Sequence, residues 1–178
     1  MDGAVSVTKP EELVPYSGPK LSYALPEIFI ADGLADDDER LWVPTGDRTW
    51  SRPLCLNASQ GYWIHLTRVR RAGIVSRHRH PGPVHGFVLK GRWHYLEHDW
   101  EAVTGSYIFE PPGDIHTLVV PDDVDEMITL FHNTGALIYC DIDGNTTGAL
   151  DVFTRIEQAR RHFEAVGLGA DYVQRFIR

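Results

Sequence analysis

The sequence predicts an all-β fold, a barrel or sandwich of antiparallel strands with an N-terminal arm and C-terminal helices. From about residue 47 onward, short runs rich in aromatic and β-branched residues alternate with turn signals. Many short strands at close, even spacing are typical of antiparallel barrels. The 178 residues suffice for one domain with its own core, and 43% apolar and 24% charged residues are ordinary for a globular protein.

The first segment is expected to be a flexible arm. Pro10, Pro15, Gly18 and Pro19 interrupt residues 1–24, which show little periodicity. The apolar run at 28–30 is a candidate edge strand, and an acidic loop follows at 32–40.

Seven runs along the middle of the chain are expected to form strands. Turn-forming pairs and triplets such as Lys90-Gly91, Pro111-Pro112-Gly113 and Asn133-Thr134-Gly135 separate them. The runs lie at residues 62–69, 84–89, 92–96, 106–109, 117–120, 127–131 and 136–142.

The end of the chain changes from strand to helix periodicity. Asp151 is placed to cap a helix that ends near Gly167. Apolar residues recur along it at three- and four-residue spacing, so one face is expected to pack on the barrel. A second short helix is expected around 172–176. The predicted division is an arm at 1–24, a β-barrel at 25–150 and a helical extension at 151–178.

Charge and composition limit the partners. The formal net charge is −8, which argues against nucleic acid and anionic membranes, because both attract basic surfaces. No apolar run approaches the roughly eighteen residues of a membrane span. The first thirteen residues lack the basic-then-apolar order of a secretory signal, and Cys55 and Cys140 are too few for a disulfide scaffold. We therefore expect a cytoplasmic protein.

Histidines are concentrated in one part of the sequence. Seven of the nine lie between residues 65 and 116. In a strand, alternate side chains share a face, so His78 and His80 would point the same way with α-carbons roughly 7 Å apart. Histidine is the commonest metal ligand, and this spacing allows two imidazoles to bind one ion.

A third histidine follows a turn further along the chain. Gly105 is followed after five residues by Pro111, then by Gly113 and, two residues later, His116. A barrel brings distant strands together, so this histidine could meet the pair inside it.

These two motifs resemble those of the cupins. The first cupin motif combines a Gly, a His-x-His pair, an acid four or five residues on, and a later Gly; the second is Gly-x5-Pro-x-Gly-x2-His-x3-Asn. The second matches from Gly105 to His116, although Val120 stands where Asn is usual. The first motif departs in two ways: Gly73 is one residue closer to His78 than the pattern asks, and His85 occupies the place of the acid. The first motif therefore does not supply the glutamate of the family's set of three histidines and one glutamate. The resemblance implies a single cupin barrel, also called a jelly roll or double-stranded β-helix.

A closer resemblance is to the 2,4′-dihydroxyacetophenone dioxygenases, which are compact cupins. It rests on residues 93–116, including Tyr95-Leu96-Glu97 and Glu110-Pro111-Pro112-Gly113, and on 25–29. It implies a non-haem Fe(2+) held by three histidines, whose positions match His78, His80 and His116. It further implies that O2 cleaves the C–C bond of an aromatic α-hydroxyketone, giving 4-hydroxybenzoate and formate, and that the protein is a homo-oligomer, a dimer or tetramer.

The residues themselves support part of this activity. Three neutral imidazoles leave the charge of a divalent metal uncompensated, which favours a chelating anion such as an enediolate. Three protein ligands also leave positions open for substrate and O2. Iron suits O2 chemistry, but imidazole also binds zinc, copper and nickel, so the sequence alone does not select the metal.

Several further residues are candidates for the site. Glu97 and Glu110 could remove the substrate proton, because burial in an apolar barrel would raise the pKa of a carboxyl group; each could equally be a solvated glutamate at a strand end. His85 could be a fourth ligand, a proton-handling group or a structural residue. Aromatic residues could line a ring pocket or simply form the core; they are Trp63, Phe87, Trp93 and Tyr95.

Three other functions fit parts of the pattern. A dioxygenase for another enolisable substrate, such as a β-diketone, would have the same metal and a different substrate profile. A non-catalytic cupin that senses a metal or ligand would normally carry an additional Cys–His zinc segment, which the sequence does not show. A metal-dependent sugar isomerase would need basic residues for a phosphate near the site.

Overall fold

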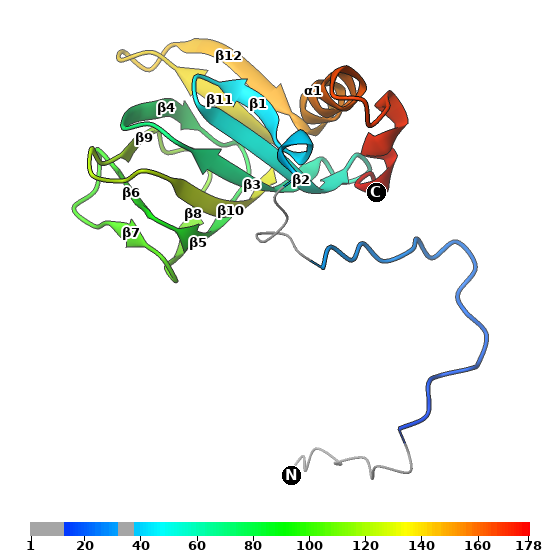
Figure 1. Ribbon diagram of the computed structural model, residues 1–178. Helices are drawn as coiled ribbons and strands as arrows, with labels where there is room; N and C mark the ends of the chain where they lie inside the picture. The colour runs from blue at the N-terminus through cyan, green and yellow to red at the C-terminus, as the bar shows by residue number, and fades with distance from the viewer. Residues whose placement is uncertain (1–12, 32–37) are drawn as a thin grey trace, which may run out of the picture.

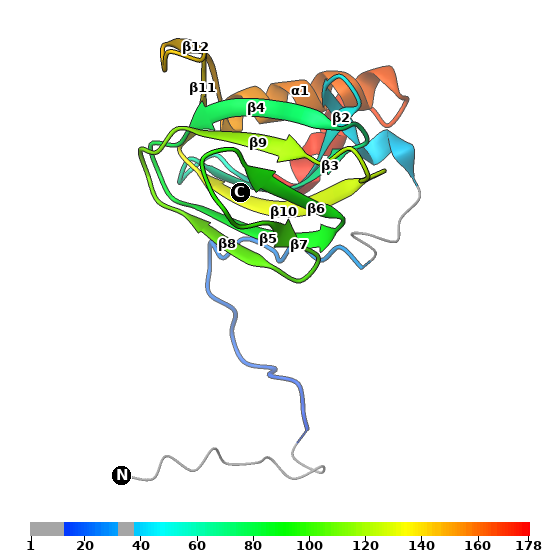
Figure 2. The ribbon, with the colours of Figure 1, turned by 90° about the vertical axis from the view of Figure 1, so that its left-hand side faces the viewer.

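The computed structural model describes residues 13–31 and 38–178, and it confirms the all-β prediction. Two six-stranded antiparallel sheets face each other, and the helix α1 lies beside one end of them (Figure 1). The view turned by 90° shows the curved strands enclosing an interior, as in a jelly roll (Figure 2). The long described segment before the barrel, residues 13–31, forms no helix or strand.

The first sheet has the order β1-β2-β3-β10-β5-β8. Its centre is the pairing of β10 with β3 and β5, which places segments far apart in sequence side by side. The strands are β1 (Val43–Gly46), β2 (Thr49–Asn57), β3 (Tyr62–Val69), β5 (Val84–Lys90), β8 (Tyr107–Glu110) and β10 (Met127–Thr134).

The second sheet has the order β12-β11-β4-β9-β6-β7. Its central pair is β4 with β9, in which His78 lies directly opposite His116. The strands are β4 (Gly73–Arg79), β6 (Arg92–Tyr95), β7 (Ala102–Val103), β9 (His116–Val120), β11 (Ala136–Cys140) and β12 (Thr146–Asp151).

The core follows from the two-residue period of the strands. In β6, Trp93 and Tyr95 are buried, whereas Arg92 and His94 alternate to the other face and are partly exposed. Trp93 and Tyr95 belong to the main core cluster between the sheets, together with valines of β3, β5 and β9. Burial of this apolar surface is the main stabilising contribution to the fold.

Helix α1 (Val152–Ala165) begins where the sequence predicts it. The Asp151 side chain accepts a hydrogen bond from the Thr154 backbone amide at 2.8 Å and so caps the helix. Ala159 and Phe163 on its apolar face are buried in a second cluster with β1, β2 and β3. The second short helix is a 3-10 turn at Ala170–Arg175.

Other elements differ from the expectation. Residues 28–30 form no strand, because the described N-terminal segment makes no ladder with either sheet. Strands β1, β2, β7 and β12 were not among the expected runs, and β4 was expected only around His78 and His80. β7 has two residues, and β12 is mostly exposed, so neither shows a clear alternation. Residues 1–12 of the predicted arm and 32–37 of the acidic loop lie outside the described residues. Among the helices described, none combines the length and apolar character that crossing a membrane requires.

Candidate metal centre

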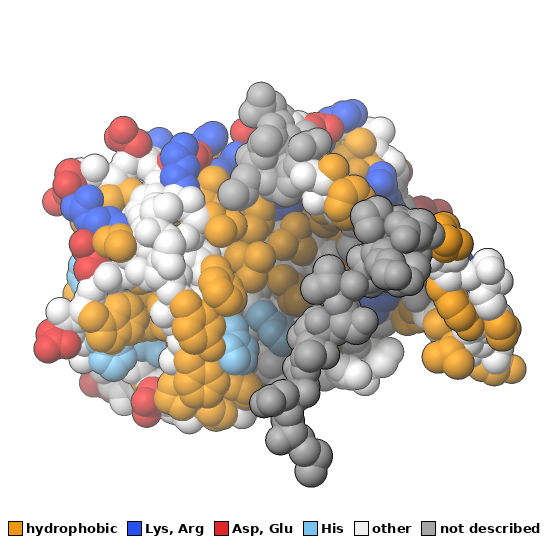
Figure 3. Space-filling view, turned by 90° about the horizontal axis from the view of Figure 1, so that it is seen from below, with side chains coloured by type: hydrophobic (Ala, Val, Ile, Leu, Met, Phe, Trp, Pro, Cys, Tyr) orange, Lys and Arg blue, Asp and Glu red, His pale blue; other side chains and the backbone are white. Residues whose placement is uncertain are grey.

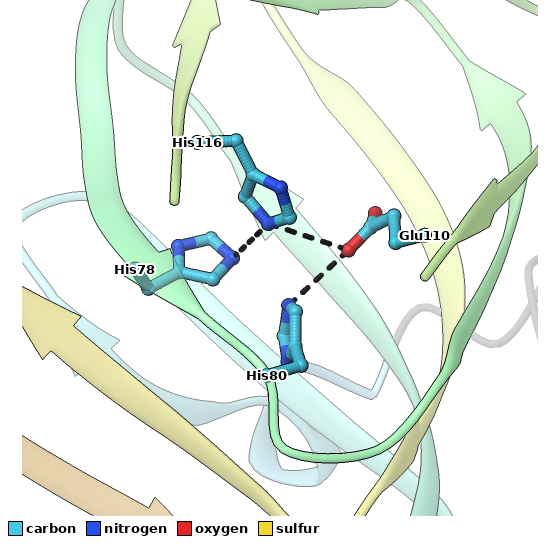
Figure 4. A group of neighbouring side chains, drawn as sticks. All are labelled: His78, His80, Glu110 and His116. Atoms are coloured by element: carbon cyan, nitrogen blue, oxygen red, sulfur yellow. Dashed lines mark hydrogen bonds and ion pairs between the residues drawn. The ribbon is translucent and has the colours of Figure 1, made fainter. Parts of the chain in front are cut away.

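Four buried side chains point at one another inside the barrel (Figure 4). His78 lies in β4, His80 follows directly after it, Glu110 is the last residue of β8 and His116 is the first of β9. Their exposed fractions are 5%, 2%, 3% and 4%. The structure therefore brings together the three predicted histidines and one of the two candidate glutamates.

The spacing of the four donor atoms is that of one coordination sphere. His78 Nε2 and His116 Nε2 are 3.2 Å apart, and Glu110 Oε2 lies 3.2 Å from His80 Nε2 and 3.5 Å from His116 Nε2. All four donor atoms lie within 4.8 Å of one another. Metal–ligand bonds of about 2.1 Å place neighbouring donors roughly 3.0–3.4 Å apart, so a divalent ion fits with small adjustments.

Hydrogen bonding within the group also fits a metal. His80 Nε2 and Glu110 Oε2 are buried; they lie 3.2 Å from each other, and neither makes a well-formed hydrogen bond to any other group. Buried polar atoms are almost always paired, and an unpaired one is costly. A cation at the centre of the group would pair with both atoms, which is the chemistry expected of three imidazoles and one carboxylate.

The local sequence explains how the group forms. The period of two places His78 and His80 on the inner face, and the β4–β9 register sets His116 opposite His78. The turn before His116 is tied to the pair, because the Gly113 amide donates to the His80 carbonyl at 2.9 Å. Gly113 has φ 107°, a conformation that favours glycine.

Two side chains orient the group from outside it. Ser76 Oγ is 2.9 Å from His78 Nδ1, which leaves Nε2 of that ring facing the centre. The Tyr95 hydroxyl donates to Glu110 Oε1 at 2.7 Å, and its ring stacks on His116 with centroids 4.1 Å apart. Tyr95 thus holds two of the four donors.

The protonation states suit metal binding. Burial lowers the pKa of His78 well below 6.5, and the neighbouring His80 and His116 lower it further, while burial also lowers the pKa of His116. Burial alone would raise the pKa of Glu110, but hydrogen bonding with His80 and the nearby His116 give it a net lowering. The expectation of a raised carboxyl pKa is therefore wrong for Glu110, which is ionised at neutral pH.

The group opens onto a cavity of about 260 Å³ between the sheets. Its wall is apolar on several sides, which suits a small organic ligand. The lining includes His78, His80, Glu110 and Tyr95, the apolar residues Val75, Val84, Leu118, Phe131 and Leu137, and the polar residues Ser51, His65, Asn133, Tyr139 and Arg155.

Glu97 does not join the group. It lies in an exposed turn after β6, where its carboxylate accepts hydrogen bonds from the Thr117 amide and hydroxyl, both at 2.7 Å. Burial would raise its pKa, but these two hydrogen bonds lower it overall. The structure thus contradicts its expected role as a base in the cavity; it instead fixes the residue next to His116.

His85 also lies elsewhere, because the strand period sends it outward when Val84 faces the cavity. Its Nδ1 is 2.8 Å from the Tyr107 hydroxyl on the outer face of the first sheet. Figure 3 shows hydrophobic side chains and histidines gathered on this face. Residues near His85 there include Phe87, Tyr107 and His132. The structure therefore places His85 away from the metal group, which favours the third alternative, a structural residue.

The aromatic pocket is smaller than expected. Of the four candidates only Tyr95 lines the cavity. Trp63 and Trp93 are fully buried in separate core clusters, and Phe87 is 47% exposed on the outer face. Trp63 and Trp93 are therefore structural, which is the usual role of aromatic residues on strands, whereas Phe87 lies on the surface outside the cavity.

Several polar residues of the cavity were not among the candidates from the sequence. His65 is buried, with Nδ1 2.7 Å from Ser51 Oγ and Nε2 3.2 Å from Asn133 Nδ2. The alternation along β3 could have indicated its inward direction. Arg155 comes from helix α1, and no strand pattern or motif points to it.

Comparison with known proteins agrees with this fold. A family model described as the ChrR cupin-like domain matches residues 31–138, more than half of the chain. The chain belongs to the ChrR cupin-like family. The match confirms the fold that the two sequence motifs imply. The glutamate of the metal group is Glu110 at the end of β8, inside the second motif, and not a residue at the position that His85 occupies.

Solved structures are similar over most of the cupin. An RmlC-like cupin protein from Ralstonia eutropha JMP134 is 25% identical, with a TM-score of 0.65, over 71% of this chain and 83% of its own. An acetylacetone dioxygenase from Acinetobacter johnsonii is 18% identical, also with a TM-score of 0.65, over 84% of this chain and 99% of its own. At these identities the likeness concerns the fold. No curated protein matches the sequence.

Proposed function

We propose that this cupin is a non-haem iron dioxygenase that cleaves a C–C bond of an enolisable ketone. The observation that carries the proposal is the buried group of His78, His80, His116 and Glu110 at the wall of a partly apolar cavity. Three neutral imidazoles and one carboxylate leave a divalent ion with net positive charge and free coordination positions, which favours a chelating anion. An ionised hydroxyketone or diketone is such an anion.

Bound iron would supply Lewis acidity toward the ketone oxygens and reactivity toward O2. The three histidines would hold it through Nε2, together with Glu110 through Oε2. Glu110 Oε2 is the carboxylate oxygen nearest the three imidazoles, so we assign it the acceptance of the α-proton of the substrate. The Tyr95 hydroxyl keeps Oε1 in place during this transfer.

The first substrate to test is an aromatic α-hydroxyketone, because the sequence resembles enzymes for 2,4′-dihydroxyacetophenone. Addition of one O2 to that ketone would give 4-hydroxybenzoate and formate. A β-diketone is the alternative, supported by the structural likeness to the acetylacetone dioxygenase. The cavity lining of Val84, Leu118 and Phe131 provides apolar contacts for either ligand.

The test is O2 uptake by protein loaded with iron under anaerobic conditions. We expect 2,4′-dihydroxyacetophenone or acetylacetone to be consumed with one O2 each, and His116→Ala to lose both iron and uptake. The matched control is His94→Ala, since His94 alternates to the outside of β6. Full iron occupancy without O2 uptake on either ketone, or purification with zinc alone and no such activity on iron loading, would contradict the proposal and favour a sensor.

Homo-oligomerisation and cytoplasmic location stay predictions of the sequence. The oligomeric state can be measured by light scattering of the purified protein.

A further inference from the structure

Arg155 brings a positive charge into the cavity from helix α1. Its side chain lines the same cavity as His78, His80 and Glu110. Nη1 donates to Gln158 Oε1 at 3.2 Å, and the buried Nε has no hydrogen-bond partner. A guanidinium has five N–H donors, so most of its hydrogen-bonding capacity is available.

No negative charge of the described residues compensates Arg155. None of the ion pairs among residues 13–31 and 38–178 includes it. The other two charged residues of the lining away from the metal group are Asp47, which is exposed, and Arg71, whose Nε donates to the Asp47 backbone carbonyl. Arg155 is partly buried, and a buried polar atom such as its Nε is costly when it has no partner.

The polar residues around Arg155 cannot take over this role. Asn133 Nδ2 donates to His65 Nε2, so His65 Nδ1 carries the proton and donates to Ser51 Oγ. Both ring nitrogens of His65 are therefore in use, and burial lowers its pKa well below 6.5, so it stays neutral. Tyr139, which also lines the cavity near Arg155, is a neutral phenol whose pKa is raised by burial.

The charges of the whole cavity favour an anion with more than one negative charge. The charges of Asp47 and Arg71 in the lining cancel in this sum. A divalent ion at the histidines would contribute two positive charges and Arg155 contributes one, while Glu110 contributes one negative charge, which leaves two positive charges. A monoanionic chelate at the metal would balance only one of them. A ligand with a second negative group would balance both and would pair with the guanidinium.

We propose that Arg155 is an anion-binding residue, and that the ligand of this cavity is an enolisable ketone that also carries a carboxylate. The carboxylate would lie on Arg155, and the ketone oxygens would lie at the histidine group. A guanidinium matches a carboxylate with two parallel hydrogen bonds, and Tyr139 offers a further hydroxyl in the same wall. The ketone end of this ligand rests on the proposed function, whereas the carboxylate end rests on Arg155 alone.

The test compares two ligands that differ only in the carboxylate. The dissociation constants of 2-hydroxyacetophenone and of 4-(hydroxyacetyl)benzoate are measured by calorimetry on iron-loaded protein without O2. We expect the carboxylate to bind at least about tenfold more tightly, because only this ligand can form a hydrogen-bonded charge pair with the guanidinium. Equal affinities of the wild-type protein for the two ligands would overturn the proposal, and this comparison needs no variant.

Variants of Arg155 test whether this residue causes the tighter binding of the carboxylate ligand. Arg155→Gln should abolish the preference for the carboxylate while 2-hydroxyacetophenone still binds, and Arg155→Lys should restore part of it. The matched control is Arg161→Gln on the exposed face of the same helix, where Arg161 pairs with Glu157; it should keep the full preference. A preference that survives in a folded Arg155→Gln protein would overturn the proposal.

The result is distinguishable from a failure of the proposed function. O2 uptake is measured separately with the same two ketones. Carboxylate preference without O2 uptake would support Arg155 as an anion site and contradict the dioxygenase. O2 uptake with 2-hydroxyacetophenone and no carboxylate preference would support the dioxygenase and contradict the anion site.

Discussion

Removal of the Tyr95 hydroxyl tests whether the buried carboxylate is a metal donor. In Tyr95→Phe the ring can keep its stacking on His116, but Glu110 Oε1 loses the hydrogen bond of 2.7 Å that it receives from Tyr95. A buried hydrogen bond to a charged group is worth about 2 kcal/mol. If that hydrogen bond sets the direction of Oε2 toward the histidines, metal affinity should fall roughly thirtyfold. Loss of a residue that orients a ligand commonly lowers metal affinity about 10- to 100-fold.

The same change should destabilise the metal-free protein. Glu110 is 3% exposed, so its oxygen cannot gain a water molecule from bulk solvent in place of the hydroxyl. A loss of about 2 kcal/mol in the free energy of unfolding corresponds to a fall of roughly 4–8 °C in Tm for a domain of this size. The pKa of Glu110 should also rise, because one of the hydrogen bonds that lower it comes from Tyr95.

The assay is competition with a chromophoric chelator, followed by thermal unfolding with and without metal. The matched control is Tyr107→Phe, which removes a hydroxyl that is 2.8 Å from His85 Nδ1 on the outer face. This control should leave metal affinity unchanged. If Tyr95→Phe binds metal as tightly as the wild type, then Glu110 is not held by Tyr95 as a donor, and the reasoning is refuted.

Three further predictions address the histidines. His78→Ala should reduce the metal content of the purified protein to below about a tenth of the wild-type value, measured by elemental analysis. His85→Ala on the outer face should keep the wild-type metal content. An equal loss of metal in both variants would contradict the site. Ser76→Ala removes the hydroxyl 2.9 Å from His78 Nδ1 and should weaken metal binding about tenfold in the same competition assay, with normal far-UV circular dichroism. Burial holds the pKa of His65 well below 6.5, so as the pH falls below 6.5 the unfolded chain takes up a proton that the folded protein does not. The free energy of unfolding should therefore decrease by about 1.4 kcal/mol per pH unit from this group, until the lowered pKa is reached. Urea unfolding of the metal-free protein at several pH values measures this decrease in the free energy of unfolding. In His65→Gln the free energy of unfolding should depend less on pH. An unchanged pH dependence in this variant would contradict the lowered pKa of His65.

Most strands could be predicted from the sequence because their signals are local. The aromatic and β-branched run at Tyr62–Val69 has the bounds of β3, and Asp151 caps α1 as its position before the helical periodicity indicates. The common direction of His78 and His80 likewise needs only the two-residue period of a strand. The edge strands β1, β7 and β12 were missed because they are too short or too exposed for a periodic pattern. The longer strand β2 was also missed, because Arg52 and Pro53 interrupt its apolar run.

The candidate site was predicted only in part. The His-x-His pair and His116 were found through motifs, but Glu110 was one of two equivalent glutamates and His85 was an open alternative. The two-residue period of β5 excludes His85 from the site. Because Val84 faces inward, the adjacent His85 faces outward. The partners of each carboxylate distinguish the glutamates, since Thr117 holds Glu97 in an exposed turn while Tyr95 holds Glu110 beside the histidines.

The sequence by itself determined the fold class, the helical end and the three histidines, because strand period, capping and turn residues act between neighbours in the chain. Only the tertiary structure decided that Glu110 joins those histidines and that His65 and Arg155 face the same cavity. These residues come from β8, β3 and α1, and their meeting depends on strand register and on where the helix packs. Register and packing are set by contacts between segments far apart in the sequence, which no local pattern contains.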